Sequence, residues 1–237
     1  MQPRPGFEST IWSDVLHARE KTDPERRDAL DRLCKSYWPA LHAWLVRRGS
    51  SREDAEDAVQ GFLAHFIEKA LVDRADPNRG RFRNYLLKTF EHWMSNERRI
   101  AGAVKRGGGR RPASLEFSPP DEETPEDAYN RSWALIVLQN AQERLRAEFE
   151  SRGMGAHYAA VCACLSGSED RPSYDDLAKR LGCTGADVGA LLHSSRRRLG
   201  ELIRSVLRDT VDSEAEVEAE VADIFKFLLR KRPNLTS

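Results

Sequence analysis

The chain has 237 residues, with 38 Lys and Arg against 38 Asp and Glu, so its formal net charge at pH 7 is zero. Hydrophobic residues make up 40% of the chain, and none of its apolar runs approaches the ~18 residues of a membrane span. The composition predicts a globular protein of one or two domains.

Signals for export and for disulfides are not evident. The first residues, MQPRPGFEST, do not combine a basic with an apolar segment, so we expect no secretory signal there. No C-x-x-C pair occurs among the four cysteines, Cys34, Cys162, Cys164 and Cys183. A disulfide scaffold or zinc ribbon is therefore not expected. We expect the cysteines to be reduced thiols in a cytoplasmic protein.

Charge is segregated along the chain. Residues 79–111 contain ten Lys and Arg against two Glu, a net charge of +8. Residues 112–130 and 212–223 each contain six acidic residues and no Lys or Arg. The overall neutrality is thus a cancellation between blocks, which predicts a basic interaction surface flanked by acidic segments. Attraction between opposite charges would allow an acidic segment to fold over the basic one and mask it.

The apolar pattern of the first half is helical. Between Leu30 and Leu45 apolar residues recur at helical spacing, and Gly49 follows as a typical C-terminal glycine. Ser51 predicts the N-cap of a second helix that continues to about Leu71.

A turn and a linker follow. Residues 76–80 (DPNRG) predict a turn, and a third helix is expected from about Phe82 to Arg99. Glycines, prolines and acidic residues make 107–125 a predicted flexible linker. Helical periodicity resumes at Trp133, and none of the segments has a convincing strand pattern.

These patterns predict an all-α protein with two small helical domains joined by a flexible acidic linker. The expected divisions are an N-terminal extension (1–27), a first helical domain (28–106), the linker (107–130), a second helical domain (131–208) and a C-terminal helical extension (209–237). The last is amphipathic and is expected to pack on a neighbouring domain through Val217, Val221, Ile224, Phe225, Leu228 and Leu229.

The second domain carries a helix-turn-helix pattern. Ser173 with Asp176 predicts the cap of a short helix, and Gly182 suits its left-handed C-terminal residue. Thr184 then predicts the cap of a longer helix that ends in three arginines, 196–198. This order is typical of DNA-binding proteins. An ordinary helical hairpin fits the same pattern, with the arginines compensating the helix dipole.

Aromatic and basic side chains are interleaved in residues 79–106. Proteins that bind single-stranded nucleic acid combine cations, which follow phosphates, with aromatic rings, which stack on bases. Core packing is the competing explanation for Phe82 and Phe90, whereas Tyr85 and Trp93 suit partly exposed positions.

Three segments in this order resemble a known family. Residues 54–62 read DAEDAVQGF, residues 82–86 read FRNYL, and residues 98–111 form a basic stretch. With the helix-turn-helix of residues 173–199, they resemble regions 2 and 4 of bacterial RNA polymerase sigma factors of the extracytoplasmic-function class. The family has a similar acidic stretch and a Phe-Arg-x-Trp-Leu motif in region 2, whereas region 4 contacts the −35 element.

The resemblance covers about residues 28–111 and 131–208 and implies a function. The chain would be a transcription initiation factor, not an enzyme, that recruits core RNA polymerase to promoters and helps open the −10 region. Its implied partners are the β′ clamp and β flap regions of core polymerase, promoter DNA, and an anti-sigma or other regulatory protein. It implies no cofactor, no metal and no membrane.

The resemblance also implies site residues. Polymerase contacts would be made by Asp54, Glu56, Asp57 and Gln60. Contacts to the melted −10 strand would be made by Arg83, Lys88, Trp93, Asn96, Arg98, Arg99, Lys105 and Arg106. Contacts to the −35 element would be made by Thr184, Asp187, His193, Ser194, Arg196 and Arg197.

The recognition helix departs from the family. Positions that usually carry Arg or Lys are Gly189 and Ser194, which leaves a poor set for reading the major groove. An atypical element, weak binding, or a role chiefly in docking on polymerase are all consistent with this departure. For the acidic stretch, a favourable first helical turn is the competing explanation.

Catalysis is not expected. The six His are scattered, and the chain contains neither H-E-x-x-H nor G-x-S-x-G. Two other interpretations stay open beside the sigma-like one: a stand-alone helix-turn-helix transcriptional regulator, and a non-DNA-binding adaptor that holds protein partners.

Overall fold

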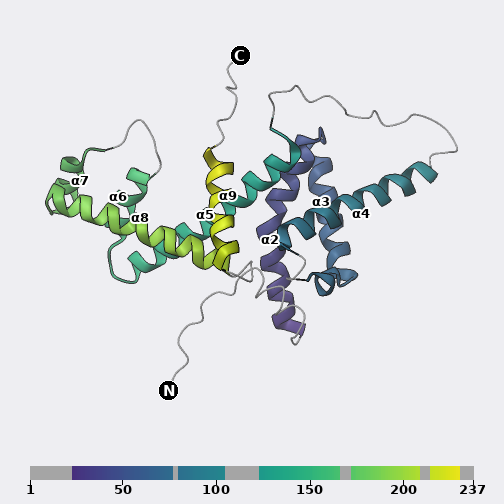
Figure 1. Ribbon diagram of the computed structural model, residues 1–237, viewed down its shortest axis with the longest axis horizontal. Coiled ribbons are helices and arrows are strands. Elements are labelled where there is room, and N and C mark those ends of the chain that lie inside the picture. The colour runs from purple at the N-terminus through teal and green to yellow at the C-terminus, as the bar shows by residue number, and fades with distance from the viewer. Residues whose placement is uncertain (1–22, 77–79, 105–122, 166–171, 209–213, 230–237) are drawn as a thin grey trace, which may run out of the picture. The chain divides into compact units, whose positions relative to one another are not determined.

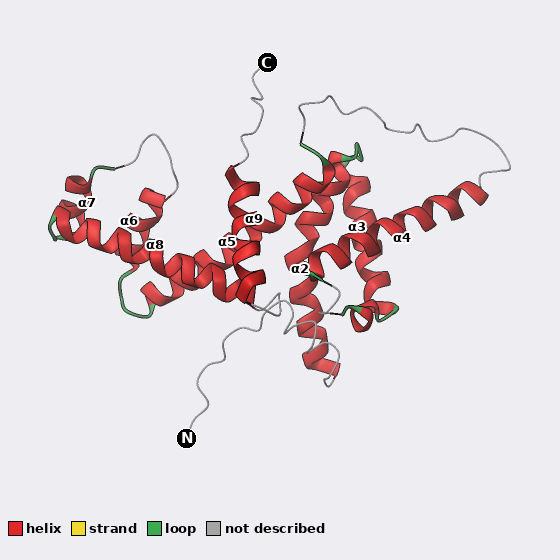
Figure 2. Ribbon diagram, viewed as in Figure 1, coloured by secondary structure: helices red, strands yellow, loops and turns green. Residues whose placement is uncertain are grey.

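The computed structural model describes residues 23–76, 80–104, 123–165, 172–208 and 214–229 (Figure 1). These residues form α-helices and one short 3₁₀ helix, and none of them is in a strand (Figure 2). The prediction of an all-α protein is confirmed. No helix in these ranges is long and apolar enough to span a membrane.

Contacts divide the chain into two compact units. Unit 1 comprises Met1–Ile136 and Arg208–Ser237, and unit 2 comprises Val137–Leu207. The boundary falls inside one helix, α5 (Pro125–Glu150), which contributes its first part to unit 1 and the rest to unit 2.

Unit 1 also contains α2 (Asp23–Arg47), α3 (Arg52–Glu68), the 3₁₀ helix η1 (Leu71–Arg74), α4 (Phe82–Val104) and α9 (Glu214–Leu229). The predicted signals between α2 and α3 are confirmed: Gly49 has φ 88°, and the Ser51 hydroxyl accepts a hydrogen bond from the Asp54 amide at 3.0 Å. Helix α3 ends before Leu71 because Ala70 is left-handed, with φ 48°.

Aromatic rings from α2, α3 and α4 form the centre of the unit 1 core. The ring centroid of Phe90 lies 4.8 Å from that of Phe62 and 5.6 Å from that of Trp44. All three side chains are buried. The core-packing explanation therefore holds for Phe90, and also for Phe82, whose ring lies 5.4 Å from that of Tyr37.

Unit 2 contains the rest of α5, α6 (Gly155–Leu165), α7 (Tyr174–Leu181) and α8 (Gly185–Arg208). Apolar side chains from α6, α7 and α8 form its core, which comprises Ala160, Val161, Cys164, Leu177, Ala178, Val188 and Leu192. The break between α5 and α6 occurs at Gly153, which has φ 69° and was not anticipated from the sequence.

Several element boundaries differ from those expected. Residues 125–130, assigned to the linker, are helical because Thr124 and Asp127 cap the start of α5; the Asp127 amide donates to the Thr124 hydroxyl at 3.0 Å. Residues 107–122 of the predicted linker lie outside the described residues. Helix α9, from the C-terminal extension that is expected to pack on a neighbouring domain, belongs to unit 1, where Glu220 pairs with Arg81 and Arg83.

Candidate nucleic-acid interface

The helix-turn-helix of unit 2 is built by the residues that the sequence singled out. The Ser173 hydroxyl caps α7 by accepting from the Asp176 amide at 3.1 Å. Gly182 is left-handed, with φ 67° and ψ 34°, and its amide bonds to the Ala178 carbonyl. A side chain is disfavoured in that conformation, so glycine sets the sharp turn into α8.

A reciprocal capping box opens α8. The Thr184 hydroxyl accepts from the Asp187 amide at 3.2 Å, and the Asp187 carboxylate accepts from the Thr184 amide at 2.9 Å. Hydrogen bonds from the hydroxyl and the amide of Thr184 lower the pKa of Asp187. Both side chains are thus engaged in holding the helix end rather than being free to read a base.

The remaining predicted −35 residues lie on the exposed part of α8. His193, Arg196 and Arg197 are exposed. The Ser194 hydroxyl is also exposed, but it donates to the Leu191 carbonyl at 2.9 Å. The hydrogen-bond donors that face solvent are therefore mostly arginine side chains from the middle of α8. Such cations suit phosphates better than base edges.

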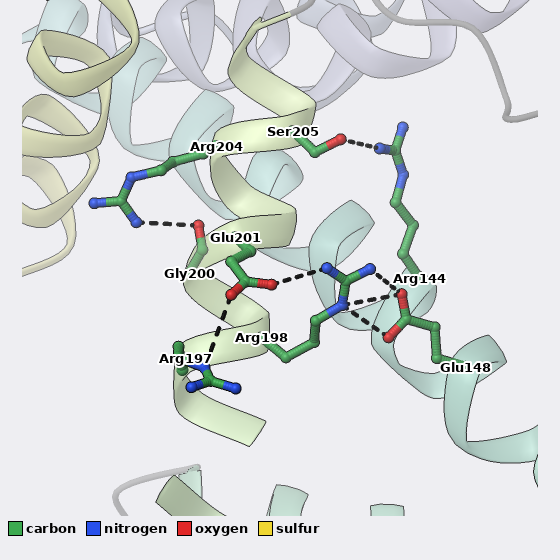
Figure 3. Close-up of polar contacts among 8 residues, drawn as sticks. All are labelled: Arg144, Glu148, Arg197, Arg198, Gly200, Glu201, Arg204 and Ser205. Atoms are coloured by element: carbon green, nitrogen blue, oxygen red, sulfur yellow. Dashed lines mark hydrogen bonds and ion pairs between the residues drawn. The ribbon is translucent and has the colours of Figure 1, made fainter. Parts of the chain in front are cut away.

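The arginine triplet does not end helix α8. Helix α8 continues to Arg208, so residues 196–198 lie in its middle, and the explanation by dipole compensation is wrong. Figure 3 shows Arg198 between Glu148 of α5 and Glu201 of its own helix. Arg198 Nη2 lies 2.5 Å from Glu148 Oε1, and its Nη1 lies 2.9 Å from Glu201 Oε2.

This pairing makes Arg198 a structural residue that joins α8 to α5. The Arg198 side chain is 46% exposed and that of Glu148 is 30% exposed. Hydrogen bonding from Arg198 outweighs burial and lowers the pKa of Glu148. Arg197, at 3.8 Å from Glu201, is held more loosely and is 75% exposed.

A cleft in unit 2 lies beside the same helix. It has a volume of ≈ 250 Å³, and the side chains that line it include Leu145, Phe149, Leu191 and Arg197. The buried Ser195 hydroxyl, also in the lining, has no hydrogen-bond partner. Apolar and cationic groups therefore meet in one concave surface.

In unit 1, α3 presents its acidic stretch to solvent. The four predicted polymerase-binding residues, Asp54, Glu56, Asp57 and Gln60, are all exposed. The opposite face of the helix carries the buried Ala55, Val59 and Phe62. Asp54 is also part of the helix cap, since its carboxylate accepts a hydrogen bond from the Ser51 hydroxyl at 2.7 Å.

Four of the eight predicted −10 residues are exposed on α4. Lys88, Asn96, Arg98 and Arg99 all face solvent. Lys105 and Arg106 lie outside the described residues.

Trp93 is half-buried against α3. Its ring stacks on that of Phe90 with centroids 6.3 Å apart and planes at 12°. A Cβ on Gly61 would lie 3.4 Å from Trp93 Cη2, so the missing side chain at Gly61 gives the indole room. The position agrees with the partial exposure expected for this residue.

Arg83 is placed differently from the other predicted −10 residues. Its side chain is 4% exposed and faces the interior of unit 1. The Arg83 Nη1 donates to the Asn130 side-chain oxygen at 2.7 Å, and the guanidinium lies over the Trp133 ring at 4.3 Å. The Tyr129 hydroxyl donates to the Arg83 carbonyl at 2.9 Å. In this conformation Arg83 cannot contact a strand, because protein groups surround it.

The charged partners of Arg83 come from α9. Arg83 Nη2 lies 3.0 Å from Glu220 Oε2 and 2.9 Å from Asp223 Oδ2. Arg81 binds the same pair, at 2.8 Å from Glu220 Oε1 and 2.7 Å from Asp223 Oδ2. The C-terminal helical extension therefore packs on a helical domain, as expected. Its acidic residues contact the start of the basic helix α4.

The buried face of α9 differs from the expected one. Val217, Val221 and Ile224 are buried as expected, together with Glu220 and Phe227. Phe225 is 54% exposed and Leu229 is 75% exposed, because the inward face follows the ion pairs with α4. In the sequence, Glu220 and Asp223 are two of the six acidic residues of 212–223, and nothing local distinguishes them from the other four.

The two carboxyl groups have opposite pKa shifts. Burial raises the pKa of Glu220, against the attraction of Arg83 and Arg81. Burial also opposes ionisation of Asp223, but hydrogen bonds from Arg81 and Arg83 outweigh it and lower the pKa of that group. The difference follows exposure: the Glu220 side chain is 2% exposed and that of Asp223 is 29% exposed.

Comparison with known proteins does not assign the chain to a family. The chain matches no protein-family model, no curated protein and no solved structure. Within the described ranges, no group of three or more His, Cys, Asp or Glu is arranged to hold a metal ion.

Proposed function

We propose that the chain is a sigma-like transcription initiation factor of the cytoplasm that brings core RNA polymerase to promoters and helps open the −10 region. Unit 1 would act as the region 2-like part and unit 2 as the region 4-like part. The observation that carries the proposal is the capped helix-turn-helix of α7 and α8, in a chain whose other unit pairs an exposed acidic helix with a basic aromatic one.

The electrostatics of unit 1 support a division of labour. The exposed acidic residues of α3 favour a basic protein surface, whereas the exposed Arg98 and Arg99 of α4 favour phosphates. The half-buried Trp93 offers an indole on the same helix for stacking. The cleft of unit 2, which apolar and charged side chains line together, is suited to receive a side chain of a protein partner such as the β flap.

Binding to purified core polymerase tests the proposal first. The full chain is expected to be retained by immobilised core enzyme and to support run-off transcription from a promoter selected from genomic fragments. Failure to bind core enzyme would overturn the proposal.

A pair of charge-reversal variants locates the polymerase contact. Glu56→Lys combined with Asp57→Lys should weaken core binding at least tenfold, because like charges would then face a basic partner. Glu68→Lys is the control, since Glu68 is an exposed acid at the other end of α3. Equal loss in both variants would argue against the assigned contact.

One observation favours a second candidate, a protein-binding adaptor. Thr184 and Asp187 are engaged in a helix cap and Ser194 in a backbone hydrogen bond, so few side chains of α8 are free to read bases. An adaptor would show no promoter affinity that falls steeply with salt, whereas phosphate contacts require such a fall.

A further inference from the structure

The contact between α9 and α4 is a compact cluster of opposite charges. Two guanidinium groups, from Arg81 and Arg83, face two carboxylates, from Glu220 and Asp223, with four N–O distances between 2.7 and 3.0 Å. Asn130 supplies the neutral partner of Arg83. Both charged partners of the buried arginine therefore come from α9 and none from the helices beside it, among the contacts of the described residues.

Without α9 these groups would form an anion-binding surface. Arginine binds carboxylate and phosphate oxygens with the same planar set of N–H donors, so the carboxylates of α9 occupy positions that phosphates suit equally well. Arg83 Nε is buried with no hydrogen-bond partner, which leaves one donor unused.

The net free energy that holds α9 in place is small enough for the helix to undock. Burying ion pairs costs desolvation that offsets much of their attraction, so the cluster contributes specificity more than net stability. The apolar contribution comes from Val217, Val221, Ile224 and Phe227, on a helix of 16 residues. Most of the stability of a helix in a protein comes from tertiary packing, so the cost of ordering α9 opposes its docking.

We propose that α9 is an intramolecular competitor of a nucleic-acid strand: Glu220 and Asp223 occupy Arg81 and Arg83 in place of strand phosphates, and the strand binds there only after α9 is displaced. The inference rests on the proposed function, because it concerns the same helix, α4, that would hold the melted −10 strand. It adds a way in which the chain limits its own contact with DNA.

Anisotropy of a labelled single-stranded oligonucleotide tests the competition in the full chain. Glu220→Gln with Asp223→Asn keeps the shapes of the side chains but removes the charges that hold α9. If α9 is docked in about nine molecules of ten, its release raises affinity about tenfold. Two added phosphate contacts also steepen the log–log salt dependence by about 1.4.

The matched control is Glu216→Gln with Glu218→Gln. Both residues are exposed acids on the same helix, and the change in net charge is identical. This control is expected to change affinity less than twofold. Equal gains in the two double variants would overturn the proposal, because they would reflect overall charge alone. A further Arg81→Gln in the released variant should remove most of the gain.

Hydrogen exchange of residues 214–229 reports whether α9 has left its surface. Ile224→Asp is a second variant expected to release α9, since Ile224 is a buried apolar residue of that helix. Lost protection with unchanged affinity would overturn the proposal, and so would protection that persists in both variants. Core binding that is retained while strand affinity does not rise would remove this inference and leave the proposed function intact.

Discussion

Arg83 shows how far a residue's type can mislead about its place. By sequence it belongs to the basic block, yet it is buried and paired with carboxylates 137 or more positions later in the chain. Among the described cations of α4, Lys88, Arg98 and Arg99 are the exposed ones. The charge at the start of the helix is balanced by the carboxylates of Glu220 and Asp223.

Arg83 should also be important for stability. Arg83→Ala is expected to lower the free energy of unfolding by about 3–5 kcal/mol, because it removes the buried one of the two guanidinium groups that compensate the buried Glu220 carboxylate. Arg83→Lys should cost about 1–3 kcal/mol, since an ammonium cannot reproduce the planar fork. Urea denaturation followed by tryptophan fluorescence measures both.

Arg99→Ala provides the comparison, because Arg99 is exposed on the same helix. Its effect should stay within about 0.5 kcal/mol. A loss at Arg99 equal to that at Arg83 would contradict the structural role assigned to the buried cluster.

The Glu148–Arg198 pair predicts a pH dependence of stability. Its lowered pKa means that the folded state favours the ionised carboxyl group, so the pair stabilises unit 2 above the ordinary Glu value of 4.5. The contribution is lost as the pH falls through the folded pKa, which lies below that value. Since Glu148 is 30% exposed, screening limits the contribution to about 0.5–1 kcal/mol.

Glu148→Gln should remove that part of the pH dependence. The measurement is urea unfolding of the full chain between pH 3 and 7, with Glu143→Gln as the exposed control on the same helix. The free energy of unfolding of Glu148→Gln should differ most from that of the unsubstituted chain at neutral pH, and the two should converge towards pH 3. Parallel curves at all pH values would show that the ion pair contributes nothing.

At the scale of elements, helix ends follow local rules. The N-caps at Ser51, Ser173 and Thr184 all lie where short sequence patterns placed them, because a cap needs only a hydroxyl and an amide three residues apart. The continuation of α8 past the arginine triplet also has a local signal, because the buried Leu202, Ile203, Val206 and Leu207 recur there at helical spacing.

Alanine substitution at two glycines of the helix-turn-helix is expected to have opposite effects on the stability of unit 2. Gly182→Ala should destabilise unit 2 by about 1–2 kcal/mol, because φ is +67° there and a Cβ strains that conformation. Gly189→Ala should stabilise it by up to about 1 kcal/mol, because alanine favours the helical conformation. A Cβ at Gly189 would lie 3.9 Å from Tyr174 Cε2, an ordinary contact.

Thermal unfolding of the two variants, followed by circular dichroism, measures this difference. The midpoint should fall for Gly182→Ala and rise for Gly189→Ala. If both variants shifted in the same direction, the turn geometry assigned to Gly182 would not be decisive.

At the scale of the whole molecule, zero net charge conceals separate surfaces. The acidic residues of α3 and the basic residues of α4 both face solvent, while part of the remaining charge cancels inside unit 1. Nucleic-acid binding should therefore depend steeply on salt, although the chain as a whole is neutral.

Arg98→Gln with Arg99→Gln should make that salt dependence shallower by about 1.4 on a log–log scale for a single-stranded oligonucleotide. Arg74→Gln with Arg146→Gln is the control, because it removes the same charge from exposed positions outside α4. Binding measured by anisotropy across a salt series gives both slopes. Equal slopes would mean that α4 does not contact phosphates.

The sequence by itself determined the all-α class, the helix-turn-helix with its caps and turn, and the exposure of the acidic stretch of α3. These features depend on residues within about four positions of one another, where hydrogen-bond geometry and helical periodicity leave little choice. Only the tertiary structure decided that α9 belongs to unit 1, that Arg83 is buried, and that Arg198 binds α5. Each of these depends on a partner 50 or more positions away, and such a pairing is chosen by the shape and charge of packed surfaces.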